Sequence, residues 1–310
     1  MKTENKKKPG ALTLTLPATS ANLGPAFDAA ALAFDLNFKI TAKPAKKYLI
    51  RASGRDTAIC SQLENNLILK TYEDILQSHD KAVFPLSIRI QNKMPLGKGC
   101  GSSAAARLAG IAFAVHFGRL GWRDAEIVAE ASRLEHHPDN AAACWLGGIA
   151  VARMTASEVQ AVKITPKGKW PLLLAIPEEK LSTEEARRVL PATYSRADAV
   201  ANIQNSMLLL AAFTQGRRDL LRNALEDRIH QPYRAPLCPL LPALQSLAGE
   251  RGILGVALSG AGPSVLLFLD PKVPVAGTRR RVAEFLKGRS LSAELLSTAI
   301  AMQGTVRKSA

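Results

Sequence analysis

Met94-Pro95-Leu96-Gly97-Lys98-Gly99-Cys100-Gly101-Ser102-Ser103-Ala104-Ala105 is the most informative stretch of this sequence. Three glycines alternate with other residues, and they let the backbone turn sharply because no Cβ is in the way. Small apolar residues follow and predict a helix over 104–117. The N–H groups of such a loop and of the helix start can converge on one anion. The stretch therefore predicts a site for a di- or triphosphate, with two serine hydroxyls available to phosphate or Mg²⁺.

Two familiar phosphate-binding motifs do not fit this loop. A Walker loop needs Gly-Lys followed by Ser or Thr, whereas Lys98 is followed by Gly99. A Rossmann fingerprint needs G-x-G-x-x-G, and this loop is G-x-G-x-G. The simplest alternative is an ordinary glycine turn before a helix, but the Gly-Ser-Ser-Ala-Ala sequence at the helix start favours phosphate binding.

Apolar periodicity around the loop predicts a mixed α+β protein. Strands are expected at 12–16, 32–41, 84–91, 149–153, 172–176, 256–259 and 265–269. Helices are expected at 67–76, 104–117, 123–134, 183–189, 196–214, 240–248 and 278–287, with a short one from about 140. Pro17 is expected to end the first strand. Residues 165–169, rich in Pro, Gly and Lys, are the expected boundary between two halves.

Composition supports a folded chain with a basic surface. The 310 residues are 47% hydrophobic and carry a formal net charge of +15. Such a charge fits a nucleic-acid partner or an enzyme that binds ATP. Only 5% of residues are aromatic, the basic residues are spread along the chain, and no nucleic-acid-binding motif is present. The nucleic-acid interpretation therefore remains the weaker alternative.

The expected compartment is the cytosol. Lys6 to Lys8 are not followed by an apolar run, so no signal peptide is expected. Residues 252–269 are uncharged, but the glycines and proline at 260–263 predict two buried strands joined by a turn. The cysteines (Cys60, Cys100, Cys144 and Cys238) show no CxxC spacing, so four reduced, buried thiols are expected. A reactive thiol at Cys100 is the secondary interpretation.

Three motifs carry a resemblance to the GHMP kinases, named for galactokinase, homoserine kinase, mevalonate kinase and phosphomevalonate kinase. Residues 94–106 resemble the central motif of this family. The sequence PATSANLGPAFD at 17–28 is similar to its N-terminal motif in homoserine kinases, and LSGAGPS at 258–264 resembles its C-terminal glycine motif. The resemblance implies a two-domain fold: an N-terminal half like ribosomal S5 domain 2 and a ferredoxin-like C-terminal half. We expect a flexible basic tail at 1–10, an ATP-binding domain at 11–165 and a C-terminal domain at 166–310.

Segments 134–140, 181–187 and 226–234 also resemble homoserine kinases. The resemblance implies ATP-dependent phosphorylation of the L-homoserine hydroxyl, a step of threonine biosynthesis. Because arginine grips a carboxylate with two parallel hydrogen bonds, Arg187 and Arg234 are expected at the substrate carboxylate. Asp28 is expected to hold the ammonium, and Asn22 to bind polar groups of the substrate. By resemblance, Thr183 lies near its reacting end.

Phosphoryl transfer needs an in-line hydroxyl and neutralised phosphate charge. We expect the N–H groups of 97–103 to hold the phosphates, and Ser103 or Ser102 to bind Mg²⁺ with Glu135. Lys98 is expected to add positive charge near the phosphates. By a weaker resemblance, Asn66 contacts the nucleobase.

Asn140 stands where some GHMP kinases carry an aspartate base. An amide does not usefully accept a proton, so we expect Asn140 to orient the hydroxyl while the proton leaves to phosphate or water. Asp139 is the alternative base. Three residues depart from the family pattern: Ala26 and His136 replace glycines, and Cys100 replaces a leucine. The two glycine replacements are expected to need positive φ.

Other functions remain open from sequence alone. The chain could phosphorylate another small alcohol, such as mevalonate, a sugar or shikimate, or act as a ligand sensor without catalysis. A metal site built from histidines is not expected, because adjacent histidines such as His136 and His137 rarely face one ion and no HExxH is present. By resemblance, a homodimer is expected.

Overall fold

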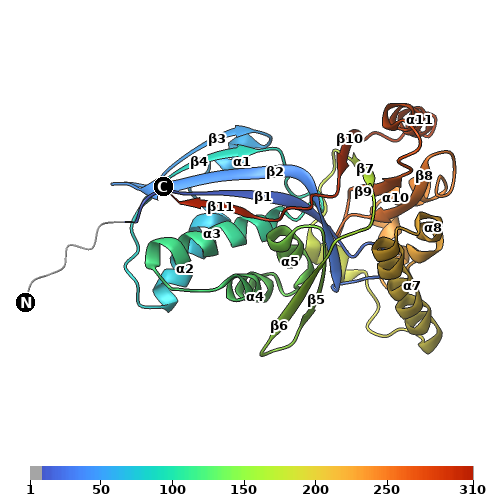
Figure 1. The fold of residues 1–310 in the computed structure, drawn as a ribbon. Coiled ribbons are helices and arrows are strands. Elements are labelled where there is room, and N and C mark those ends of the chain that lie inside the picture. The colour runs from blue at the N-terminus through green and yellow to red at the C-terminus, as the bar shows by residue number, and fades with distance from the viewer. Residues whose placement is uncertain (1–8, 310) are drawn as a thin grey trace, which may run out of the picture.

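The computed structural model describes residues 9–309 (Figure 1). Most of the expected basic tail, at 1–8, lies outside the described residues. Two sheets with helices packed against them make up the described chain, and the glycine loop lies between the two sheets (Figure 1). The mixed α+β class is confirmed.

The first sheet has seven strands in the described chain, on the path β11-β1-β2-β4-β3, with β5 paired to β2 and β6 paired to β5. Its strands are β1 Leu12–Ala21, β2 Ala30–Pro44, β3 Leu49–Gly54, β4 Leu86–Asn92, β5 Ile149–Met154, β6 Val159–Ile164 and β11 Val306–Ser309. All pairs are antiparallel except β3 with β4. Alternate residues of β4 and of β1 up to Leu16 face the core, as the period of a half-buried strand predicts, whereas β1 is buried throughout from Leu16 to Ala21.

Helices cover one face of this sheet, below it in Figure 1. They are α2 Leu67–Ser78, α3 Ser102–Gly118, α4 Asp124–Glu135 and α5 Asp139–Leu146; the short α1 Thr57–Cys60 follows β3. Small residues let α3 approach its neighbour α2 closely. A Cβ on Gly110 would lie only 2.6 Å from the Ile68 carbonyl oxygen.

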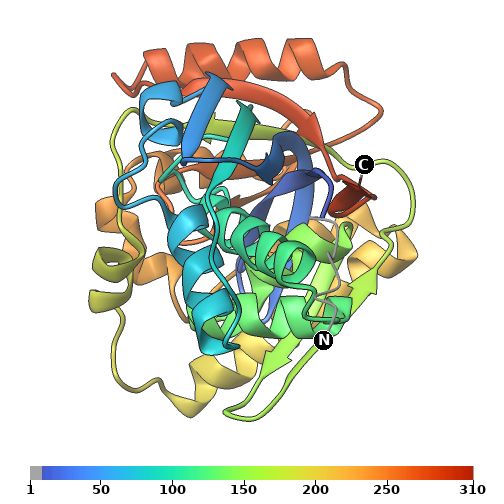
Figure 2. The ribbon, with the colours of Figure 1, turned by 90° about the vertical axis from the view of Figure 1, so that its left-hand side faces the viewer.

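The second sheet has the order β10-β7-β9-β8 and is antiparallel throughout. Its strands are β7 Pro171–Ile176, β8 Ile253–Leu258, β9 Val265–Leu269 and β10 Glu294–Ala299. The helices of this half are α6 Thr183–Arg188, α7 Arg196–Gln215, α8 Leu221–Ala224, α9 Gln231–Arg234, α10 Leu240–Gln245 and α11 Val275–Lys287, with 3₁₀ turns at Arg218–Leu220 and Ala235–Leu237. Helix α11 lies beside β10 along the top of Figure 2.

Every predicted strand and helix is present, with ends that differ by a few residues. The expected break at Pro17 is wrong. β1 continues through Pro17 to Ala21, because its register against β2 shifts between Pro17 and Ala18 and a bulge accommodates the missing N–H. The strands β3, β6, β10 and β11 were not predicted. The expected boundary at 165–169 lies between β6 and β7, while β11 returns to pair with β1.

The uncharged stretch 252–269 forms β8, a glycine turn and β9, as predicted. Across residues 9–309, no helix is both long enough and apolar enough to cross a bilayer. The four cysteines are buried and free, which confirms the expected thiols.

Candidate active site

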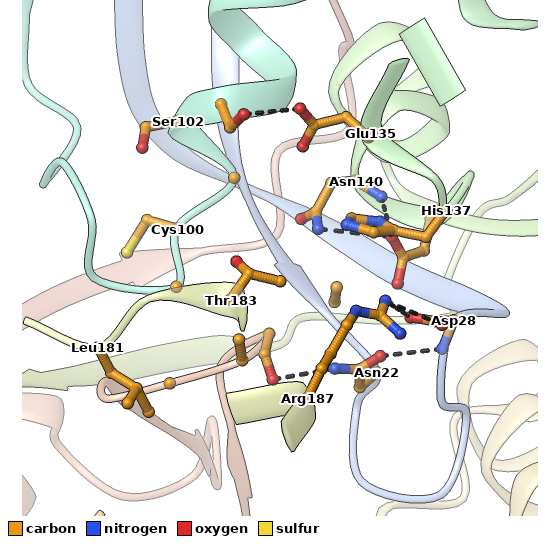
Figure 3. Close-up of a pocket in the computed structure, with 18 of the residues that line it drawn as sticks. Asn22, Asp28, Cys100, Ser102, Glu135, His137, Asn140, Leu181, Thr183 and Arg187 are labelled. Carbon is orange, nitrogen blue, oxygen red and sulfur yellow. Dashed lines mark hydrogen bonds and ion pairs between the residues drawn. The ribbon is translucent and has the colours of Figure 1, made fainter. Parts of the chain in front are cut away.

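A cavity of about 130 Å³ lies where the glycine loop meets both halves of the chain (Figure 3). Sequence reasoning predicted most of its lining, although the predicted residues are far apart in the chain. The predicted residues that line it are Asn22, Asp28, Gly97, Gly99, Cys100, Gly101, Ser102, Ser103, Glu135, Asn140, Thr183, Arg187 and Arg234. The two arginines and the glycine loop therefore share one cavity.

The glycine loop has the backbone conformation that its sequence predicts. Gly97, Gly99 and Gly101 have φ of 68°, 73° and 69°, the left-handed region that glycine enters most readily. None of the N–H groups of 97–101 donates to a main-chain carbonyl of the described residues. The first N–H groups of α3, which begins at Ser102, have no intrahelical partners, and no side chain caps the helix. Loop and helix start together present unpaired N–H groups and a positive helix end, which suits an anion.

Glu135 ends α4 and faces the start of α3. Ser103 Oγ donates to Glu135 Oε1 at 2.6 Å, and Arg107 Nε donates to the same oxygen at 2.5 Å. A hydroxyl and a carboxylate beside the phosphate loop are the oxygen ligands that Mg²⁺ prefers. The donor set therefore fits a magnesium ion bound to nucleotide phosphates.

The start of α5 supplies a connected polar group. Thr19 Oγ1 donates to Asn140 Oδ1 at 2.6 Å, which fixes the amide so that its Nδ2 remains the donor. Asp139 Oδ1 accepts from the Asn140 backbone N–H at 2.7 Å and lies 2.7 Å from His137 Nδ1. Burial lowers the pKa of His137, but the hydrogen bond and charge of Asp139, with smaller contributions from nearby carboxylates, raise it above its usual value.

Asp28 connects the two halves through an ion pair. Arg187 Nη2 donates to Asp28 Oδ1 at 2.8 Å and to Oδ2 at 2.9 Å, and Figure 3 shows the two side chains facing each other. Asn22 holds the same loop: its Oδ1 accepts from the Asp28 N–H, and its Nδ2 donates to the Gly260 carbonyl. Asp28, His137 and Asp139 each offer one ligand atom, and these three atoms lie within 4.8 Å of one another. The cluster suits a cationic group, either an ammonium or a metal ion.

Arg234 is the largest fully buried side chain of the described residues. Its Nε donates to the Ala186 carbonyl at 2.9 Å, and its Nη1 lies 3.2 Å from His230 Nδ1. Burial, followed by the charge of Arg187, lowers the pKa of Arg234 to about 10, so it stays charged at neutral pH. Its guanidinium and that of Arg187 lie 5.3 and 5.4 Å from the centre of the Phe27 ring. Two positive groups thus face one end of the cavity.

A second, more apolar cavity of about 310 Å³ adjoins the first. Ser102 and Ser103 line both cavities, so the start of α3 stands between them. Asn66 and Leu96 line the second one together with apolar side chains such as Phe38. Asn66 also caps α2 through bonds to two backbone N–H groups. An apolar cavity next to a phosphate site is suited to a nucleobase.

Other loop residues have different surroundings. Lys98 Nζ donates to carbonyls of 177–179, including that of Pro177 at 3.0 Å, so its charge is bound at the end of β7. Ala104 and Ala105 are buried in the first turn of α3. Pro95 is buried and precedes the glycines in the chain. Burial raises the pKa of Cys100 to about 12, which argues against a reactive thiol there.

One of the two expectations about replaced glycines is correct. His136 has φ of 64°, in the region that glycine would occupy more easily. Ala26 does not have positive φ, so that expectation is wrong: its N–H donates to the Asn22 carbonyl in a turn that alanine can adopt. His137 and the turn Gly260–Gly262 also line the cavity, and Thr19 contacts its lining residue Asn140; none of these was predicted as a site residue. The segment 134–140, which contains His137, was the signal from which its place in the site could have been predicted.

Two family models match this chain: the GHMP kinases N terminal domain over residues 66–148 and the GHMP kinases C terminal domain over residues 209–288. A homoserine kinase of Solibacter usitatus is 42% identical over 258 residues, covering 83% of this chain and 84% of its own. A homoserine kinase of Deinococcus radiodurans is 36% identical over 294 residues, covering 95% and 96%. The crystal structure of a homoserine kinase from Cytophaga hutchinsonii shares the fold, with a TM-score of 0.81 over 99% of this chain and 100% of its own at 23% identity.

Proposed function

This chain belongs to the GHMP kinase family, and from that premise we propose that it transfers the γ-phosphate of ATP to the hydroxyl of L-homoserine. The product is O-phospho-L-homoserine, and the reaction is a step of threonine biosynthesis. The observation that carries the proposal is one cavity that joins an anion-binding glycine loop to Asp28 and a pair of arginines. Such a cavity offers separate places for a phosphate, an ammonium and a carboxylate.

The nucleotide binds with its base in the apolar cavity beside Asn66 and its phosphates along the loop. We infer this placement of base and phosphates because Ser102 and Ser103 line both cavities, so the two cavities meet at the start of α3. The free N–H groups of the loop and the start of α3 bind phosphate oxygens. Ser103 and Glu135 would hold Mg²⁺, which neutralises charge on the transferring phosphate when bound.

The amino-acid end of the substrate lies against Phe27, between the two arginines. Arg234 is buried and held by the Ala186 carbonyl, so its guanidinium is already oriented for a carboxylate. Arg187 is the more exposed of the pair and binds Asp28. Asp28, next to His137 and Asp139, is the negative group available for the ammonium.

The substrate hydroxyl is oriented by Asn140 without a protein base. Thr19 occupies Asn140 Oδ1, and Asn140 Nδ2 donates one N–H to Asp139 Oδ1 at 3.4 Å, so the amide offers its second N–H to the hydroxyl oxygen. The hydroxyl proton stays directed at phosphate or water. Thr183 lines the same cavity and contacts the reacting end. Asp139 already accepts from the Asn140 N–H and lies against His137, which supports a positioning role for it. If Asp139 were the base, Asp139→Asn would lower turnover by several orders of magnitude with substrate binding intact.

A coupled assay of ADP release with L-homoserine tests the function directly. We expect Mg²⁺-dependent turnover of homoserine, and little turnover of mevalonate, sugars or shikimate. Turnover of one of those alcohols alone would place the chain with another GHMP kinase. ATP binding without transfer to any alcohol would indicate a sensor, and salt-dependent nucleic-acid binding without ATP binding would favour the third alternative. Homodimerisation and a cytosolic location remain predictions, which light scattering and cell fractionation address.

A further inference from the structure

The C-terminal half carries another cavity, of about 520 Å³, formed by α8, α9, α10 and β8. It has no lining residue in common with the cavity at the glycine loop, as far as the described residues show. Its polar lining includes Arg222, Glu226, Arg228 and Gln231, and its apolar lining includes Leu225 and Val256. Nothing in the proposed kinase reaction uses these side chains.

Gln231 is an unsatisfied donor in the wall of this cavity. The residue is 3% exposed, and its Oε1 accepts from the Leu258 backbone N–H at 2.7 Å. That bond fixes which end of the amide is oxygen. The other end, Nε2, is buried and has no hydrogen-bond partner among residues 9–309. A buried donor without a partner costs about 1–3 kcal/mol, so a ligand acceptor is a physical explanation for it.

Three charged side chains of this cavity form no ion pair within the described chain. Arg222, Arg228 and Glu226 are exposed, and none of them forms an ion pair with another described residue. Asp227 differs, because its carboxylate accepts from the backbone N–H groups of 229–231 and holds the start of α9. The cavity thus offers two guanidiniums, one amide donor and one free carboxylate.

We propose that this cavity is a second binding site, for a small α-amino acid. The ligand carboxylate accepts from Arg222, Arg228 and Gln231 Nε2, because guanidinium and amide donors together satisfy its two oxygens. Its ammonium pairs with Glu226. Its side chain lies on the apolar wall that includes Leu225 and Val256. The site does not depend on which alcohol the kinase phosphorylates.

Gln231 opens α9, and Arg234 closes it. The same short helix therefore contributes Gln231 and Pro232 to this cavity and Arg234 to the cavity at the glycine loop. An amino acid bound at Gln231 would thus contact the element that presents Arg234 to the proposed active site. The two cavities must be separated experimentally, because the active site itself accommodates amino acids under the proposed function.

The test uses the full chain with Arg187→Ala, which weakens amino-acid binding at the proposed active site. Saturation-transfer NMR with each of the protein L-amino acids as the probe should find at least one that binds. Adding Arg228→Gln should weaken its binding at least about tenfold, the loss expected for one charge-assisted hydrogen bond. Arg280→Gln on α11 is the matched control, since it removes the same charge from another exposed arginine and should leave binding unchanged.

Gln231→Glu is a second variant that separates ligand binding from folding. It keeps the oxygen that accepts from Leu258 but replaces the unpaired donor with an acceptor, so it should abolish binding while thermal unfolding stays cooperative. Three results would overturn the proposal: no amino acid binds the Arg187→Ala protein, binding survives Arg228→Gln, or inorganic phosphate and an acid without the amino group bind equally well. Kinase activity of the unmodified chain is measured separately, so failure of one proposal leaves the other testable.

Discussion

Replacing Gly101 with alanine tests whether the phosphate loop positions Asn140. A Cβ at Gly101 would lie 1.8 Å from Thr19 Oγ1 and 3.1 Å from Asn140 Oδ1, so Thr19 must move. The 2.6 Å bond from Thr19 to Asn140 would then break. Gly97→Ala is the control, because Gly97 has nearly the same φ but its nearest neighbour would be 3.9 Å from the new Cβ. Both variants bear the cost of a left-handed alanine, about 1–2 kcal/mol.

The difference between the two variants measures the lost contact with Asn140. A displaced buried partner costs about 1–3 kcal/mol, which corresponds to roughly a 10- to 100-fold decrease in kcat for Gly101→Ala. Gly97→Ala should raise the KM for ATP and leave kcat nearly unchanged. Thr19→Val should reproduce the decrease in kcat, since it removes the hydroxyl and leaves the loop glycines in place. Steady-state kinetics and circular dichroism are the assays, and equal kcat in the two glycine variants would refute the reasoning.

Three other changes give separate expectations. Arg187→Ala should raise the KM for homoserine about 10- to 100-fold through loss of a charge-assisted carboxylate contact, whereas Arg188→Ala, on the exposed face of α6, should stay near the unmodified value in the same assay. Ser103→Ala should raise the Mg²⁺ concentration for half-maximal rate about tenfold, and Ser102→Ala should not; a magnesium titration that gives the reverse would assign the metal to Ser102. Burial lowers the pKa of His230 to about 4 in the folded chain, below the value of about 6.5 expected when the chain is unfolded. The folded state therefore loses up to about 3 kcal/mol of its free energy of unfolding as pH falls from about 6.5 to 4. Urea unfolding of His230→Gln between pH 7 and 5 should therefore show a shallower pH dependence, and an unchanged slope would contradict this origin.

The local pattern of the sequence predicts most elements, but it does not carry their long-range pairing. The glycine loop could be predicted because positive φ at alternate positions is a local demand that glycine meets. β6 could not, since its side chains are half exposed and its apolar alternation is weak. β11 is four residues long, and its partner β1 lies at the other end of the chain.

The same distinction applies to the candidate site. Arg187 and Arg234 entered the prediction through resemblance, and only the fold brings both to the glycine loop. Thr19 was not predicted as a functional residue, because nothing near it in sequence shows that its hydroxyl contacts a residue 121 positions away. His137 was considered only as a metal ligand and set aside, and its proximity to Asp28 could not be predicted because Asp28 approaches it from another segment. Contacts of this kind follow from tertiary packing rather than from periodicity.

The N-terminal motif at 17–28 and the C-terminal glycine motif at 258–264 both form hydrogen bonds to the glycine loop. The Thr19 N–H donates to the Cys100 carbonyl at 3.1 Å, and Ser259 Oγ donates to the Gly99 carbonyl at 2.8 Å. Two carbonyls of the loop are thus bound by the N-terminal and C-terminal motifs. A Cβ on Gly99 would lie 2.1 Å from the Ser259 carbonyl oxygen, so only glycine allows this approach. Because carbonyl oxygens repel phosphate, hydrogen bonds that occupy these two carbonyls favour the loop's N–H groups as its contribution to the proposed anion site.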